Sequence, residues 1–125
     1  MVKVPGFLLK RLYVKGSLRN TMDGFQLSLK NTLGSGYAMK LLPLRVDGAE
    51  MPFESSFFFL DGREVPFSTV TKQTPFTLAM NRETNMMVRG KKLDPGPHKV
   101  TIGFTVVGLG DLTFDVADEV ATPAP

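Results

Sequence analysis

The stretch that decides the fold is Gly24-Phe-Gln-Leu-Ser-Leu-Lys-Asn31, in which apolar and polar side chains alternate. Successive side chains of a β-strand point to opposite faces, so this spacing places Phe25, Leu27 and Leu29 on one face and the polar side chains on the other. The stretch therefore predicts a strand that buries one face against a core.

The same alternation recurs later in the chain, and turn-forming residues separate the runs. The residues expected to face the core are Val100, Ile102, Phe104 and Val106 in one run, Leu112, Phe114 and Val116 in another, and Leu42, Leu44 and Val46 in a third. The turn signals are Pro5-Gly6, Asp23-Gly24, Gly34-Ser-Gly36, Asp47-Gly48, Asp61-Gly62, Asp94-Pro-Gly96 and Gly108-Leu-Gly110. Short strands with such frequent turns, and no stretch of helical period, predict an all-β fold. We expect a single-domain antiparallel β-sandwich, jelly-roll or immunoglobulin-like, over residues 1–120 with little or no helix, and a flexible tail over 121–125.

One pattern occurs twice: VDGAEMPFES at 46–55 returns as LDGREVPFST at 60–69. An Asp-Gly pair between two strands is a strong signal for a two-residue hairpin turn, because that turn needs positive φ, which Gly adopts without strain. A calcium loop would need further oxygen ligands at alternate positions, where both copies have apolar or basic residues instead. We therefore interpret both copies as hairpin turns rather than as a paired-carboxylate site.

Few residues are candidates for chemistry. The chain has no Cys, which excludes disulfides and zinc–thiolate sites, and His98 is its one histidine, which excludes a multi-histidine metal site. His98 follows a Pro-Gly turn, where a surface histidine at the start of a strand is expected, and it leaves at most an isolated acid/base role. Neither Gly34-Ser-Gly36 nor Gly108-Leu-Gly110 matches a phosphate loop or a dinucleotide fingerprint. We expect no catalytic, metal-binding or cofactor-binding residue and no cofactor.

Basic residues gather in the first part of the chain. Residues 1–45 carry eight Lys and Arg against one Asp, whereas residues 93–125 carry one Lys against five acidic residues. A basic face can bind nucleic acid, but these residues are scattered and no aromatic recognition motif accompanies them. We expect the two segments to be solvated or to lie near each other, and we do not expect nucleic-acid binding.

No apolar run approaches the roughly 18 to 20 residues that span a bilayer. The short apolar run near the N-terminus is interrupted by Lys10 and Arg11, unlike the apolar region of a signal peptide. We therefore expect a cytoplasmic protein without membrane contact.

Some predicted strands are apolar on both faces. In the stretch from Ser55 to Leu60, alternation puts Phe57 and Phe59 on one face and Phe58 and Leu60 on the other. A two-layer sandwich buries one face of each sheet, and we expect Phe58 and Leu60 on the outer face. Such residues are covered either by loops and the N-terminal segment or by another protein. We predict an interface with a larger subunit or a second copy, formed by Phe58, Leu60, Leu41, Met86 and Met87.

The order of DGFQLSLKN, LRVDGAEMPF, FFFLDGREV and KKLDPGPHKVTIGF resembles the small beta subunit of bacterial C-glycoside deglycosidases and its uncharacterised relatives, from about residue 7 to residue 116. The resemblance implies a β-sandwich accessory subunit bound to a larger alpha subunit. That alpha subunit is a metal-dependent barrel that cleaves the carbon–carbon bond of oxidised C-glycosides. In that family the metal and the catalytic base belong to the larger chain, so no catalytic residue is carried onto this sequence.

The opening KVPGFLLKRLYVKGSLRNT is also similar to that of short proteins labelled hydroxymethylglutaryl-CoA reductase. This chain has no nucleotide fingerprint and is short for a domain that binds both cofactor and thioester. We therefore expect a non-catalytic accessory subunit that binds and stabilises a larger enzyme, such as a deglycosidase-like carbon–carbon lyase. The alternative is a stand-alone binding module or a homo-oligomeric structural protein.

Overall fold

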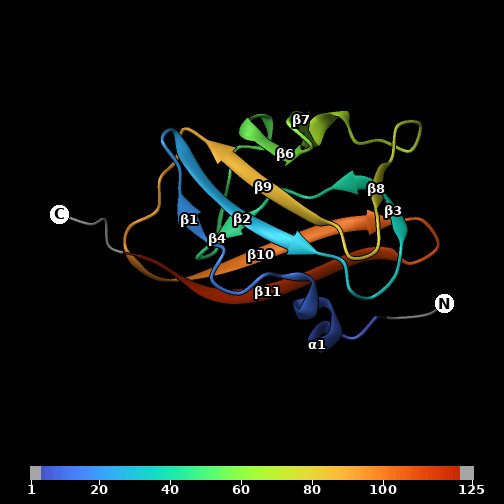
Figure 1. Ribbon diagram of the computed structural model, residues 1–125, viewed down its shortest axis with the longest axis horizontal. Helices are drawn as coiled ribbons and strands as arrows, with labels where there is room; N and C mark the ends of the chain where they lie inside the picture. The colour runs from blue at the N-terminus through green and yellow to red at the C-terminus, as the bar shows by residue number, and fades with distance from the viewer. Residues whose placement is uncertain (1–3, 122–125) are drawn as a thin grey trace.

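The computed structural model describes residues 4–121, in which two antiparallel sheets pack face to face (Figure 1). The first sheet has the order β1 (Arg19–Asn20), β2 (Gly24–Lys30), β9 (Glu83–Arg89), β6 (Ser56–Leu60) and β7 (Arg63–Pro66). The second has β5 (Ala49–Glu50), β4 (Arg45–Val46), β10 (Gly96–Val106), β3 (Gly36–Leu41) and β8 (Phe76–Leu78), with β11 (Gly110–Val120) paired to β10. The predicted all-β sandwich with little helix is confirmed. Beyond Ala121, the predicted tail lies outside the described residues.

The helical elements are short. They are the α-helix α1 (Gly6–Leu9) and the 3-10 turns η1 (Lys10–Leu12), η2 (Phe53–Ser55) and η3 (Phe67–Thr69). The predicted turn at Pro5-Gly6 is the start of α1, where Pro5 precedes the first turn and its fixed φ fits a helix entry. Within residues 4–121 no helix is long and apolar enough to cross a membrane.

The core contains the alternating residues that the sequence places inward. Phe25, Leu27, Val100 and Ile102 are completely buried, and the inward set of β11 is buried as well. Leu42 is an exception, because it follows the last residue of β3 and packs against Gly103 on the outer face of β10. Pro43 interrupts the strand pattern here, so alternation does not continue from Leu42 to Leu44.

The two Asp-Gly hairpins are confirmed. Val46 pairs with Ala49 around one turn, and Leu60 pairs with Arg63 around the other. Both central residues of each turn have positive φ, at 53° and 85° for Asp47 and Gly48 and at 52° and 75° for Asp61 and Gly62. These angles are those of the turn type whose twist matches two paired strands.

The predicted orientation of β6 is wrong. Phe58 is 2% exposed and stacks on Phe76 with ring centroids 4.0 Å apart, and Leu60 packs against the core from the same face. Phe57 and Phe59 point outward instead. Alternation identifies two faces but not which one is buried; here Phe67 and Phe76, contributed by η3 and β8, fix the choice.

The segment between α1 and β1 closes one long side of the sandwich. It runs between β11 of the second sheet and β2 of the first (Figure 1), with Tyr13 forming a β-bridge to Leu29. The Tyr13 hydroxyl donates to Asp118 at 2.5 Å, and the Gly16 N–H donates to the same carboxylate oxygen at 2.8 Å. These bonds join the basic N-terminal part of the chain to the acidic C-terminal strand.

Candidate ligand-binding end of the sandwich

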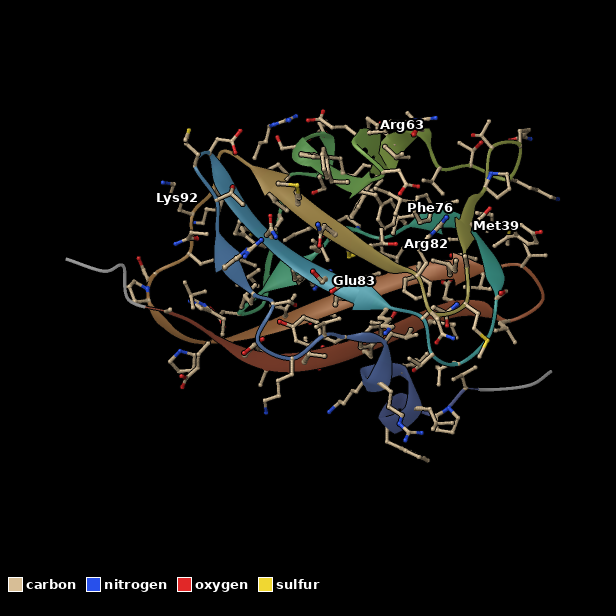
Figure 2. All side chains as sticks on the ribbon, in the orientation of Figure 1. Met39, Arg63, Phe76, Arg82, Glu83 and Lys92 are labelled. Atoms are coloured by element: carbon tan, nitrogen blue, oxygen red, sulfur yellow. The ribbon has the colours of Figure 1, made fainter. Side chains whose placement is uncertain are left out.

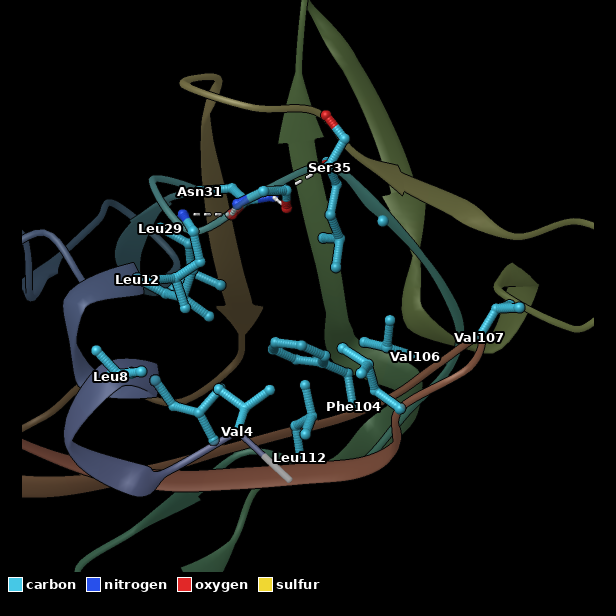
Figure 3. Close-up of a pocket in the computed structure, with 16 residues that line it drawn as sticks. Val4, Leu8, Leu12, Leu29, Asn31, Ser35, Phe104, Val106, Val107 and Leu112 are labelled. Carbon is cyan, nitrogen blue, oxygen red and sulfur yellow. Dashed lines mark hydrogen bonds between the residues drawn. The ribbon is translucent and has the colours of Figure 1, made fainter. Parts of the chain in front are cut away.

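At one end of the sandwich, residues of both sheets and of the N-terminal segment line a cavity of about 530 Å³ that is partly open to solvent (Figure 3). It lies where β2 and β10 end and β3 and β11 begin, and the N-terminal helical segment covers it from one side. Its walls include Leu8 and Leu12 from that segment, Leu29 from β2, and Phe104 and Leu112 from β10 and β11. Ligand sites in proteins commonly have volumes of 300–1,000 Å³ and mostly apolar walls.

The lining is apolar except for Asn31, Ser35 and two glycines, and none of the lining residues within the described chain is charged. Asn31 has no free hydrogen-bonding capacity, because its amide donates to the carbonyls of Gly34 and Leu78 and its oxygen accepts from two backbone N–H groups. The Ser35 hydroxyl accepts from the N–H of Met80. These polar side chains hold the loops that form the mouth of the cavity.

Exposed apolar side chains gather at the same end. Of the seven exposed large hydrophobic residues between positions 4 and 121, five form what we call the apolar rim: Phe7, Leu33, Tyr37, Met80 and Val107. Leu33 and Val107 line the cavity itself, and Phe7 is next to its lining residue Leu8. The Val107 N–H donates to the Tyr37 carbonyl at 3.0 Å, and the Met80 N–H donates a hydrogen bond to the hydroxyl of the lining residue Ser35. Concentration of exposed apolar groups at one place is characteristic of a binding surface.

The turn that carries Met80 is fixed by Arg82. The guanidinium of Arg82 donates to the Thr77 carbonyl and lies over the Phe76 ring at 5.7 Å. Figure 2 shows the side chains of Arg82 and Phe76 next to each other. This contact connects the rim to the aromatic core around Phe58. The rim is therefore attached to the packed core of the sandwich.

His98 and Asp47, which are far apart in sequence, lie together at another place in the fold. The Nδ1 atom of His98 is 2.6 Å from Asp47 Oδ2, and Nε2 is 2.7 Å from the Asp94 carbonyl oxygen. The His98 side chain is 11% exposed, so it is more buried than the surface histidine we expected. The Asp94 carbonyl, and then the Asp47 carboxylate, raise the pKa of His98.

The His98–Asp47 pair has the arrangement of a structural contact. Both ring nitrogens of His98 face acceptors, so the protonated ring, in which both nitrogens donate, suits the site. The N–H of Lys99, at 2.9 Å, and then His98 lower the pKa of Asp47. In residues 4–121 no group of three or more His, Cys, Asp or Glu side chains is placed to hold a metal ion.

The outer face of the first sheet is covered partly from within. Phe57 is 4% exposed because Arg89 lies over its ring at 4.3 Å, and Arg89 is in turn held by Glu64 and Asp23. Phe59 remains 38% exposed. Long basic side chains cover apolar surface in this way while keeping their charge in water.

The structure corrects the predicted interface residues. Phe58, Leu41 and Met86 are at most 2% exposed and Leu60 packs on the core, so they are not on the surface where the prediction placed them. Met87 alone lies on the outer face, beside Phe57 and Phe59. Sequence reasoning missed the apolar rim. The available signal was the presence of Leu33, Val107 and Leu109 inside or beside Gly-rich turns, where polar residues are usual.

Fold and cavity together define a β-sandwich protein with an open, apolar cavity at one end. The family model described as hydroxymethylglutaryl-CoA reductase, N-terminal domain, matches residues 8–121. The chain belongs to this family, and the similarity noted for its opening segment extends over most of its length. No curated protein sequence matches the chain. The resemblance to the beta subunit of C-glycoside deglycosidases is not tested by this match and stays a prediction.

Proposed function

We propose that the protein is a non-catalytic β-sandwich module that binds a larger enzyme chain, and that the apolar rim is its contact surface. The observation that carries the proposal is the concentration of Phe7, Leu33, Tyr37, Met80 and Val107 around one end. Fully burying a large apolar side chain stabilises a complex by roughly 1.5–3 kcal/mol relative to leaving it exposed. A contact over this end therefore gains more from apolar burial than a contact over a surface of equal size with fewer exposed apolar side chains.

The hydrogen bonds of His98 support a module that does not carry out the chemistry itself. A general base needs an unprotonated nitrogen within reach of its substrate, and both nitrogens of His98 are directed at acceptors of the protein. Asp47 is likewise occupied by His98 and by the Lys99 N–H. In this proposal the catalytic groups belong to the partner.

Two classes of enzyme are candidates for the larger chain. The family description refers to the N-terminal domain of a reductase, which supports a module that works beside a catalytic part. The sequence resemblance over DGFQLSLKN and KKLDPGPHKVTIGF points to a carbon–carbon lyase acting on oxidised C-glycosides. Both alternatives require a surface on the sandwich that a catalytic part covers.

Affinity purification from the native host tests the proposal. The chain is used in three forms: wild type, the rim variant Leu33→Asp with Val107→Asp, and the control Met22→Asp. Met22 is 95% exposed and lies in the β1–β2 turn, so the control adds a charge to an apolar surface residue outside the rim. We expect an enzyme subunit to co-purify in equal amount with the wild type and the control, and to be lost with the rim variant.

The activity of the purified complex then identifies the partner's class. Cleavage of an oxidised C-glycoside assigns a lyase, and oxidation of a nicotinamide cofactor with a thioester substrate assigns a reductase. The proposal is refuted if the wild-type chain retains no enzyme subunit, or if the rim variant retains it as well as the control does.

A further inference from the structure

The geometry points to a second binding role, one of the chain without its partner on the rim: the cavity at the open end holds the aliphatic chain of a small amphiphile, with the polar head at the mouth. The cavity measures about 530 Å³, several times the roughly 150 Å³ of an engineered apolar cavity that binds benzene. It is therefore large enough for an extended or folded alkyl chain.

The chemistry of the walls selects an apolar ligand. Asn31 uses its amide in four hydrogen bonds within the protein, and no lining residue in the described part of the chain carries a charge. A polar group inserted among Leu8, Leu29 and Leu112 would lose its hydrogen bonds to water without gaining others, which is costly. The inserted part of the ligand must therefore be hydrocarbon.

The shape of the lining favours an aliphatic chain over a planar ring. Among the residues that line the cavity, Phe104 is the one aromatic, and Leu and Val side chains form most of the wall. Figure 3 shows Leu8, Val4 and Leu12 projecting from the N-terminal segment toward Phe104 and Leu112 on the opposite wall. Because the cavity opens to solvent past Leu33 and Val107, the head group of the ligand stays hydrated while its chain is buried.

Calorimetric titration of the purified chain with dodecanoate and with dodecanol, each below its micelle or solubility limit, tests the inference. We expect both to bind, since the chain rather than the head is recognised. Each methylene removed from the buried part should weaken binding by roughly fourfold, which corresponds to about 0.8 kcal/mol per methylene. Acetate, which keeps the carboxylate and lacks the chain, should give no binding.

Two variants locate the site. In Leu8→Trp the new side chain fills the cavity, whereas in Met22→Trp it replaces a side chain that is 95% exposed in the β1–β2 turn, outside the cavity and the rim. We expect Leu8→Trp to reduce dodecanoate affinity at least tenfold and Met22→Trp to leave it within about twofold. Equal affinity in the two variants would overturn the assignment.

A measurement on the wild-type chain keeps the test valid if Leu8→Trp does not fold. In methyl-resolved NMR spectra, dodecanoate should shift the methyl signals of Val106 and Leu112 and leave those of Val46 and Val100, away from the cavity, unchanged. Absence of binding by dodecanoate and dodecanol, or shifts centred on Val46 and Val100, would overturn the inference. These experiments use the isolated chain, so their failure leaves the partner-binding proposal intact.

Discussion

Replacing Phe58 by Ala should remove a large part of the stability of the fold. Phe58 is 2% exposed, stacks on Phe76 and lies 5.0 Å from the Phe67 ring. Truncating a buried Phe lowers the free energy of unfolding by about 3–5 kcal/mol. Because Phe58→Ala also loses the stacking with Phe76, we expect its cost in the upper part of that range. Small domains have a total unfolding free energy of about 5–15 kcal/mol, so we expect Phe58→Ala to be marginally folded.

Equilibrium unfolding in urea measures this effect, with Phe59→Ala as the matched control. Phe59 is the next residue on the same strand and is 38% exposed, so its truncation should cost about 1 kcal/mol or less. With a urea dependence of about 1–3 kcal/mol per molar, the midpoint of Phe58→Ala should fall by at least 1 M. Equal midpoints for the two variants, or a larger loss for Phe59→Ala, would refute the orientation of β6.

Three further changes test other contacts. Gly24→Ala should cost about 2 kcal/mol or more in urea unfolding, because a Cβ there would lie 1.8 Å from a backbone oxygen of β9; an unchanged midpoint would contradict that close approach. Tyr13→Phe should cost about 1 kcal/mol near neutral pH. Burial first, and then the hydrogen bond to Asp118, raise the pKa of Tyr13 above its ordinary 10.0. The stability that the protonated hydroxyl contributes should therefore be lost from the wild type as the pH rises above 10.0, and Tyr13→Phe should show no such loss. Burial would raise the pKa of Asp118, but the hydrogen bonds from Tyr13 and from backbone N–H groups outweigh it and lower the pKa. The stability that the ionised Asp118 carboxylate contributes should therefore be present above pH 3.8 and lost as the pH falls below it. The pKa of His98 is raised, so the stability that its protonated ring contributes is present below pH 6.5 and is lost as the pH rises above it. The unfolding midpoint should therefore fall as the pH rises above 6.5 in the wild type and fall less in His98→Asn, and equal slopes would contradict the contact with Asp47.

Local sequence patterns predicted the elements whose geometry depends on residues adjacent in sequence. Alternation in residues 24–30 identified β2 and its apolar core residues Phe25, Leu27 and Leu29, although Gln26 and Ser28 on the other face are buried as well. The Asp-Gly pairs identified both hairpins, because turn geometry depends on neighbouring residues. The choice of buried face in β6 depends on Phe76, which lies distant in sequence, and alternation carries no information about it.

The candidate site could not be predicted from local sequence patterns, for a similar reason. Leu29, Phe104 and Leu112 were each predicted as core residues, and the cavity among them depends on how β2, β10 and β11 are arranged around the N-terminal segment. The contact of His98 with Asp47 also depends on the pairing of β4 with β10, which the sequence does not display. Leu33 and Val107 in Gly-rich turns were the nearest local signal of the rim.

Hydrogen–deuterium exchange on the chain, free and in the complex purified from the native host, tests the binding end most directly. We expect slower exchange in the complex at residues 31–37, 79–82 and 107–109, which carry rim residues, and unchanged exchange at the opposite turns 21–24 and 90–95. Slower exchange confined to those opposite turns or to the outer face around Phe59 and Met87, with the rim segments unchanged, would contradict it.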